Sequence, residues 1–186
     1  EVFNEMSKVM PSLNNISWER VDKEDSVTYP CDDKNLPGNE IVFSKNFPTS
    51  SGLAKIVPTD LISPHELPDQ NFPFVLTTGR LLEHWHTGAM TRRSNTLHNI
   101  EPEAIVNMNR LDMKNLRLEP GNKVQVKTRR GSIELSVRQD TELPKGMIFI
   151  PFCFSEAAAN KLTNPQLDPF GKIPEFKYCA ANIEAC

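Results

Sequence analysis

Small polar residues, a glycine and an arginine follow an apolar run at Thr77-Thr78-Gly79-Arg80. Hydroxyl groups and exposed backbone N–H groups can bind phosphate oxygens, and glycine lets a ligand approach the backbone closely. An arginine can hold a phosphate with two parallel hydrogen bonds. The pattern therefore indicates a site for an anionic ligand. A plain strand-to-loop turn with a surface arginine gives the same four residues, because short glycine motifs recur by chance.

Two histidines flank a tryptophan at His84, Trp85 and His86. In an extended segment both histidine side chains would point the same way. That arrangement is compatible with a metal pair, but no third ligand lies nearby in the sequence, and a zinc site has at least three protein ligands. We therefore expect no metal here. The planar donors and acceptors suit packing, hydrogen bonding or the binding of a flat heterocycle such as a pterin.

Other basic residues are less informative. Arg92 and Arg93 add positive charge shortly after Arg80, which favours an anionic ligand but also fits a solvated basic loop. Arg129 and Arg130 fall at an expected hairpin tip, where charge is usually surface charge, and we assign them no role. No residue is identified as catalytic.

The four cysteines form no Cys-x-x-Cys pair, so zinc and iron–sulfur ligation are not supported. The first five residues contain no methionine, no basic region and no signal-type apolar core, which favours a fragment or a processed product. Without a signal peptide, we expect reduced thiols in a cytoplasmic protein.

Composition and motifs exclude several classes of protein. The net charge of -3 gives no general attraction to nucleic acid or to an acidic membrane surface. No apolar run approaches the length that spans a bilayer. Nucleophile elbows, Walker loops and Rossmann glycine fingerprints are missing. We expect a globular protein with neither nucleic acid nor membrane as partner.

The first 70 residues are predicted to be mostly irregular. Apolar residues at helical spacing predict a short helix over residues 1–13, ended by Pro11. Frequent prolines then exclude long helices and central strands, although short strands are expected near residues 40–43 and 54–57. Because so long an irregular stretch is unusual inside a compact domain, we interpret residues 14–70 as a connector lying across the surface of something larger.

The rest of the chain carries a β pattern. Short apolar or alternating runs predict strands over residues 72–76, 104–108, 123–127, 132–137 and 147–152. Asn109 is expected to cap a short helix over residues 110–116, and Ser155 a helical turn over residues 156–160. Gly131 can take a positive φ in the hairpin turn. Several short strands with regular turns indicate a small barrel.

Motifs in the middle of the chain resemble one enzyme family. Residues 76–93 resemble a signature of the dimethyl-sulfoxide-reductase superfamily of molybdenum and tungsten oxidoreductases, at the start of their carboxy-terminal dinucleotide-binding domain. Residues 118–124 and Arg129-Arg130-Gly131 are similar to that domain's barrel hairpin, with Asn122 where aspartate is commoner.

The two ends of the chain resemble one branch of this superfamily. Residues 159–165 and 172–180 look like the tail of formate dehydrogenase catalytic subunits. Residues 17–20 and 29–31 are similar to the segment that precedes the dinucleotide-binding domain in those enzymes. The resemblance thus covers nearly the whole chain, and the tail favours formate over nitrate as substrate.

The resemblance implies a mostly β fold with short helices: a double-psi β-barrel plus an irregular N-terminal extension. Residues 1–66 would be that extension, formed by the end of the preceding cofactor-binding domain and a connector. Residues 67–186 would be the molybdopterin-dinucleotide-binding barrel.

Carried over position by position, the resemblance also implies cofactor contacts. One run would line the pterin and diphosphate, namely Thr78, Gly79, Arg80, Leu81, Leu82, Glu83, His84, Trp85, His86 and Thr87. Phe152 would lie near the substrate funnel or the pterin, and Asn160 and Lys177 would hydrogen-bond the dinucleotide. From the residues alone, the favoured interpretation is that Asn160 is a surface residue at a helix end and Lys177 a solvated charge.

The implied reaction is the oxidation of formate to carbon dioxide, with electrons passing through the metal and iron–sulfur clusters to NAD. The cofactor would be bis-molybdopterin guanine dinucleotide, with molybdenum or tungsten held mainly by upstream parts missing here. Partners would be the upstream domains of the same catalytic subunit and iron–sulfur and NAD/flavin subunits. Because metal ligands and cluster cysteines lie upstream in the family, the isolated chain is expected to be inactive. The alternatives are the equivalent fragment of a nitrate reductase, and a free-standing nucleotide-binding or interaction barrel without redox function.

Overall fold

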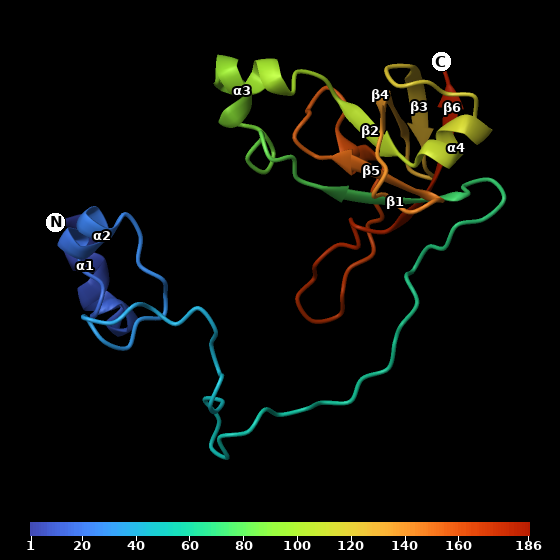
Figure 1. Ribbon diagram of the computed structural model, residues 1–186. Helices are drawn as coiled ribbons and strands as arrows, with labels where there is room; N and C mark the ends of the chain where they lie inside the picture. The colour runs from blue at the N-terminus through green and yellow to red at the C-terminus, as the bar shows by residue number, and fades with distance from the viewer. The chain divides into compact units, whose positions relative to one another are not determined.

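The computed structural model describes residues 1–186. They divide into two units, Glu1–Asp60 and Leu61–Cys186, which are described separately (Figure 1). None of the helices is both long and apolar enough to cross a membrane. The expected boundary after residue 66 stays a prediction.

The first unit contains two short helices. The helix expected over residues 1–13 is present as α1 (Val2–Val9), followed by the 3-10 turn η1 (Pro11–Leu13). The second helix, α2 (Trp18–Glu24), was not predicted, although the Ser17 side chain caps it by accepting a hydrogen bond from the backbone N–H of Arg20 at 3.1 Å. A serine directly before a helical run is a start signal that could have located it.

The strands expected near residues 40–43 and 54–57 are wrong, because both stretches are turns, bends or irregular backbone. An isolated strand leaves its N–H and C=O groups unpaired and needs neighbouring strands to be stable. The first unit contains no other strand that could pair with them.

The second unit is a closed six-stranded barrel with strand order β1-β5-β2-β4-β3-β6. Its strands are β1 (Phe74–Gly79), β2 (Ile105–Met108), β3 (Lys123–Lys127), β4 (Ser132–Gln139), β5 (Met147–Pro151) and β6 (Cys179–Ala185). The β1–β5 and β2–β4 pairs are parallel and the other pairs antiparallel. The predicted mostly β fold built on a barrel is therefore confirmed.

Strand β6 closes the barrel between β1 and β3, and no pattern had predicted it. Its first half is rich in alanine, which has little strand preference. Ala180 and Ala181 are nevertheless fully buried, because β6 is paired on both sides. Tertiary packing, not local preference, makes this segment a strand.

The barrel is filled by alternate side chains of its strands. Val124 and Val126 on β3 and Ile148 and Ile150 on β5 are fully buried, as the period-2 pattern predicts. Burying a side chain of this size contributes about 1.5–3 kcal/mol relative to leaving it exposed. The core therefore accounts for the unit's cohesion.

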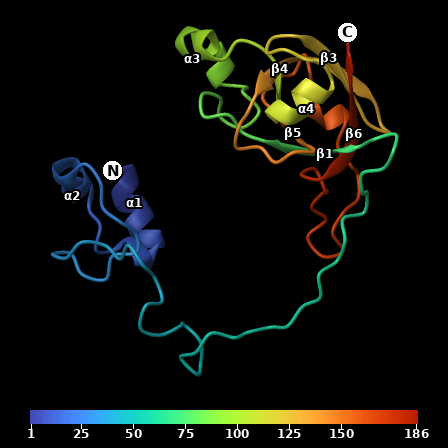
Figure 2. The same ribbon diagram turned by 45° about the vertical axis from the view of Figure 1, so that its right-hand side comes forward.

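Helix α4 (Arg110–Asn115) covers the end of the barrel where β2 ends and β5 begins, and Figure 2 shows it across that opening. As predicted, the Asn109 side chain caps the helix by accepting from the backbone N–H of Leu111 at 2.8 Å. The buried Asp112 carboxylate accepts the backbone N–H of Gly146 at 2.6 Å, which ties α4 to the start of β5. This end is built from contacts between α4 and the neighbouring strand ends.

Three details differ from expectation. Gly131 does not take a positive φ, whereas Gly121 and Gly146 do, so the β3–β4 turn closes without the left-handed residue. The helical turn expected over residues 156–160 is a 3-10 turn, η3 (Ala159–Lys161), with no side-chain cap from Ser155. Two short helices between β1 and β2 were not predicted, η2 (Thr91–Arg93) and α3 (Asn95–Ile100).

Candidate functional site

The parallel pairing of β1 and β5 sets the first two residues of the site side by side. Gly79 pairs with Pro151 at the carboxyl ends of the strands, and the Phe152 backbone N–H donates to the Gly79 carbonyl oxygen at 3.1 Å. Arg80 and Phe152 therefore leave the barrel together at the same edge. Carboxyl ends of parallel strands are where α/β proteins commonly place ligands, and the same geometry operates here.

The loop after β1 returns to this edge through a left-handed turn. His86 has a φ of +50°, and its ring centroid lies 5.1 Å from that of Phe152. The backbone at residues 84–86 is thus not extended, so the condition under which His84 and His86 would point the same way is not met. His86 is exposed near Phe152, whereas His84 is buried.

His84 serves the packing of the loop. Its Nε2 donates to the Glu101 carbonyl oxygen at 2.8 Å, and its Nδ1 lies 3.3 Å from the Thr91 hydroxyl. The edge of its ring faces Phe154, with centroids 5.7 Å apart. No set of three or more His, Cys, Asp or Glu side chains is arranged to hold a metal ion.

The ends of β1 and β5 form the first wall of the site and the loop after β1 the second. The third wall is the segment that enters β6. The Thr78 hydroxyl donates to the Phe176 carbonyl oxygen at 2.8 Å, so β1 fixes the backbone just before β6 begins. Phe176 and Lys177 lie at the same edge as the carboxyl ends of β1 and β5, because β6 runs antiparallel to β1. Thr78 is itself buried, with its hydroxyl occupied by this contact.

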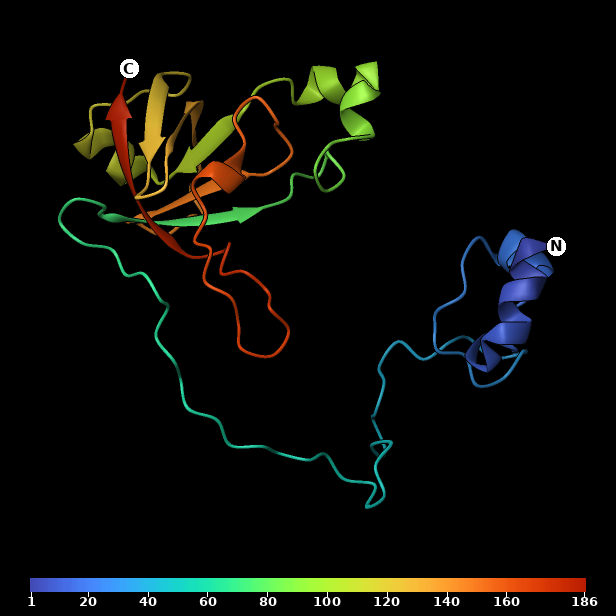
Figure 3. The ribbon, with the colours of Figure 1, turned by 180° about the vertical axis from the view of Figure 1, so that it is seen from behind.

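The fourth wall is η3 and the residues after it, with the long loop that leads to β6. In Figure 3 this loop, coloured orange to red, extends from the barrel near β1. Asn160 lies on η3 and Thr163 directly after it. The amide of Asn160 is exposed and available to a ligand.

These four walls border an open cavity of about 890 Å³. Its lining residues are Arg80, His86, Thr87, Phe152, Asn160, Thr163, Pro174, Phe176 and Lys177. The lining includes two cations and no carboxylate, which suits an anionic ligand. The guanidinium of Arg80 lies over the ring of the exposed Trp85, 5.6 Å from its centroid.

Six of the thirteen residues predicted from the sequence line this cavity: Arg80, His86, Thr87, Phe152, Asn160 and Lys177. Trp85 does not line the cavity, but its ring contacts the guanidinium of Arg80, which does. Thr78 holds the backbone of the lining residue Phe176 through a hydrogen bond. The assignment of these residues to cofactor contacts stays a prediction.

The other predicted residues lie away from the lining. An added Cβ at Gly79 would lie 2.7 Å from the Phe149 ring, so that ring occupies the space beside this glycine and leaves none there for a ligand. Leu82 is almost fully exposed, and Leu81, Glu83 and the buried His84 are not among the lining residues.

Sequence reasoning missed Thr163, Pro174 and Phe176 as lining residues. All three lie inside the tail motifs used for the family resemblance. The proximity of Thr163 to Asn160, and of Phe176 to Lys177, was a signal that could have found them.

The cysteines lie outside the cavity lining, and all four are free thiols. Burial raises the pKa of Cys153 to about 11, so this thiol is protonated at neutral pH. Burial also raises the pKa of Cys179. Because the thiolate is the nucleophile, neither is set up for covalent chemistry.

A closed mixed barrel with two cations in a cavity at one edge suits an anionic, partly planar ligand. Residues 74–180, more than half of the chain, match the family model described as Molydopterin dinucleotide binding domain. The chain belongs to this family. The predicted cofactor class, a molybdopterin dinucleotide, is thereby confirmed.

Curated relatives cover nearly all of the chain. It is 43% identical over 184 residues to the F420-dependent formate dehydrogenase subunit alpha of Methanocaldococcus jannaschii. It is 39% identical over 184 residues to the F420-dependent formate dehydrogenase 1 subunit alpha of Methanococcus maripaludis. Each match includes 99% of this chain but 27% of the relative, so the chain spans about a quarter of their length.

A solved structure with the same fold is the acetylene hydratase of Pelobacter acetylenicus. The match covers 62% of this chain and 18% of the acetylene hydratase chain, with a TM-score of 0.57 and 20% sequence identity. This likeness concerns the fold alone. Together, the family and the relatives confirm the resemblance to formate dehydrogenase catalytic subunits. The electron carrier in the relatives' names is F420, so the expectation of NAD is not supported.

Proposed function

We propose that this chain is the cofactor-binding carboxy-terminal part of a molybdenum or tungsten formate dehydrogenase alpha subunit. Its cavity would hold part of a molybdopterin guanine dinucleotide. The proposal rests on the way that separate segments of the chain meet at one cavity. Residues predicted as cofactor contacts come from four separate segments, at Arg80, His86, Phe152, Asn160 and Lys177, and line one cavity.

The residues present fit such a ligand. A volume of about 890 Å³ lies within the range of ligand sites in proteins. Neither Arg80 nor Lys177 takes part in an ion pair, so both cations are free to neutralise phosphate charge. The adjacent rings of His86 and Phe152 provide a surface for a flat heterocycle.

Each side chain then has a defined task. The planar guanidinium of Arg80 would hold a phosphate through two donors, and Trp85 beneath it restricts its motion. Asn160 offers a donor and an acceptor to ring atoms, and Lys177 a point charge. The bound cofactor supplies the redox chemistry, while these residues orient it and exclude water.

In the complete protein, formate would lose a proton and two electrons to give carbon dioxide. We propose F420 as the final acceptor, since the relatives named above are F420-dependent enzymes. The metal ligand and the iron–sulfur relay would come from parts of the protein outside this chain and from partner subunits. The resemblance further implies a cytoplasmic enzyme.

The binding site is tested by exchanging Arg80 in the complete protein. A charge-assisted hydrogen bond contributes about 1.5–3 kcal/mol, so Arg80→Ala should bind the cofactor roughly ten- to a hundredfold more weakly. Arg80→Lys should retain part of the affinity, because it keeps the charge but loses the planar fork. Metal and guanine nucleotide per chain, measured at limiting cofactor, give the result.

Arg110→Ala is the matched control, because Arg110 is an exposed arginine on α4 at the opposite end of the barrel. Equal occupancy in wild type and both Arg80 variants would refute the site. The reaction is tested separately by formate-dependent reduction of F420 in the cofactor-loaded complete enzyme. Reduction of nitrate instead would support a nitrate reductase, and absence of bound metal and dinucleotide would support a binding module.

A further inference from the structure

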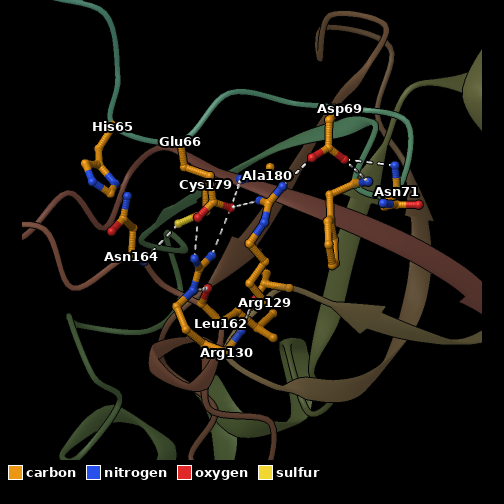
Figure 4. A network of polar contacts seen from close by, with 12 residues as sticks. His65, Glu66, Asp69, Asn71, Arg129, Arg130, Leu162, Asn164, Cys179 and Ala180 are labelled. Carbon is orange, nitrogen blue, oxygen red and sulfur yellow. Dashed lines mark hydrogen bonds and ion pairs between the residues drawn. The ribbon is translucent and has the colours of Figure 1, made fainter.

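The arginine pair in the β3–β4 turn has no part in the proposed cofactor contacts, yet it takes part in a network of ion pairs and hydrogen bonds. Figure 4 shows Arg129 and Arg130 beside Glu66 and Asp69 of the segment that leads into β1, with Leu162 also in the network. Glu66 is the residue that they share. Its side chain is 10% exposed, far less than that of either arginine.

Arg130 uses three of its nitrogens at once. Its Nε donates to the Leu162 carbonyl oxygen at 2.9 Å. Its Nη1 and Nη2 donate to the two carboxylate oxygens of Glu66, the second at 3.2 Å. The guanidinium is therefore held in one orientation between a backbone carbonyl and a carboxylate.

Glu66 also contacts the start of β6. Its Oε1 accepts the backbone N–H of Ala180 at 2.9 Å. Burial alone would raise the pKa of Glu66, but hydrogen bonds from Arg130 and Ala180 and the charges of both arginines hold this pKa below its ordinary value. The carboxylate is thus ionised at neutral pH and can accept all of these donors.

The two anchored backbone positions adjoin the cavity walls. Leu162 lies between Asn160 and Thr163, and Ala180 follows Lys177 by three residues. Arg130 and Glu66 therefore form a polar path from one wall to the other. Two parallel ties run beside it, because the backbone N–H of Asn164 donates to Cys179 Sγ at 3.1 Å and its side-chain amide donates to Glu175 Oε2 at 2.9 Å.

We infer that Glu66 and Arg130 are positioning residues for the dinucleotide, holding the Asn160–Thr163 wall and the Lys177 wall at a fixed separation. The inference rests on the proposed function, since it concerns the ligand of that cavity. Neither residue lines the cavity, so both act through the backbone. Fixing the walls before binding lowers the ordering cost that the ligand must offset.

Arg129 provides a matched comparison within the same turn. It also pairs with Glu66, at 2.9 Å, and with Asp69, and it lies over the ring of Phe72 at 4.6 Å. It contacts no backbone carbonyl of the Asn160–Thr163 wall. A general loss of charge or stability would thus affect Arg129 and Arg130 variants alike, whereas loss of wall positioning would be specific to Arg130.

The test uses the complete protein with its cofactor, in wild type and in Arg130→Gln, Arg130→Lys, Arg129→Gln and Glu66→Gln variants. Release of guanine nucleotide after dilution is measured, together with hydrogen exchange of the backbone over residues 160–163 and 177–180 in the cofactor-free form. Arg130→Gln should release the nucleotide roughly tenfold faster, which corresponds to about 1.4 kcal/mol. Exchange should rise in both wall segments.

Arg130→Lys should fall between wild type and Arg130→Gln, because one ammonium can pair with Glu66 but cannot also reach Leu162 with the same geometry. Arg129→Gln should leave exchange at residues 160–163 unchanged. If Arg130→Gln yields no folded protein, Glu66→Gln serves instead, since it keeps the shape and an acceptor for Ala180. It should accelerate both release and exchange.

Wild-type release and exchange in the folded Arg130 or Glu66 variants would overturn the inference. If Arg80→Ala still loses cofactor in that case, the proposed function stands and only the positioning role fails. If Arg80→Ala also binds as wild type does, the proposed function fails, and the positioning role fails with it. Equal acceleration by Arg129→Gln and Arg130→Gln would likewise reject a specific role for Arg130.

Discussion

The two ends of the barrel are built in different ways. At the α4 end, Asn109 caps the helix that follows it and Asp112 accepts the backbone N–H of Gly146 at the start of the neighbouring strand, so both side chains are hydrogen-bonded within the fold. At the cavity end, two cations, Arg80 and Lys177, are exposed and free of ion pairs.

This difference separates stability from binding. A closed, satisfied end contributes to the free energy of unfolding, whereas an open end with unpaired donors leaves interactions to a ligand. The cavity end is still fixed, because Thr78 holds Phe176 and Arg130 holds Leu162. Substitutions at the α4 end should therefore alter stability, and substitutions in the cavity lining should alter cofactor binding.

The largest effect is expected at the α4 end. Met113 is 3% exposed and belongs to the core, so Met113→Ala should lower the free energy of unfolding by about 2–5 kcal/mol. Met90 is 69% exposed on the loop beyond β1, and Met90→Ala should change stability by less than about 0.5 kcal/mol. Denaturant unfolding of the cofactor-free protein measures both. Equal destabilisation would show that α4 does not seal the core.

The same contrast explains what the sequence could predict. Strands β3 and β4 follow from alternation, and α4 follows from Asn109, because these signals act over a few neighbouring residues. Strand β6 was not predicted, because the buried Ala180 and Ala181 carry no local strand signal. Its pairing with β1 and β3 depends on segments far away in the chain.

Site residues divide along the same line. Family motifs indicated Arg80, Phe152, Asn160 and Lys177, but only the parallel register and the returning loops show that they line one cavity. Leu82 lies in the same run but is 97% exposed and outside the cavity lining, so its cofactor contact stays a prediction.

A middle-sized effect is expected in the cavity lining. Asn160→Ala and Lys177→Ala should each weaken cofactor binding by about 1–3 kcal/mol, because a polar group of the bound ligand would lose its partner. The midpoint of thermal unfolding of the cofactor-free form should stay close to wild type, since both side chains are exposed. Guanine nucleotide per chain and thermal unfolding are the two measurements. Wild-type nucleotide content in both variants would remove these residues from the site.

The smallest effect is a pH dependence at Glu66, which joins the two walls of the cavity end. Burial raises the pKa of Glu66, but hydrogen bonds from Arg130 and Ala180 and the charges of Arg130 and Arg129 together hold this pKa below the ordinary 4.5. A lowered folded pKa contributes stability above the unfolded value, and this contribution is lost as pH falls through the folded value. Glu66→Gln should therefore be less stable than wild type near neutrality, and the difference should shrink below pH 4.5.

Other carboxylates with lowered pKa, such as Asp69, titrate in both proteins and cancel in the comparison to first order. Glu134→Gln, an exposed change on β4, is the control and should follow the wild-type curve. Denaturant unfolding at several pH values measures the difference. A constant gap between wild type and Glu66→Gln down to about pH 3 would mean that the Glu66 charge adds nothing to the stability of this end.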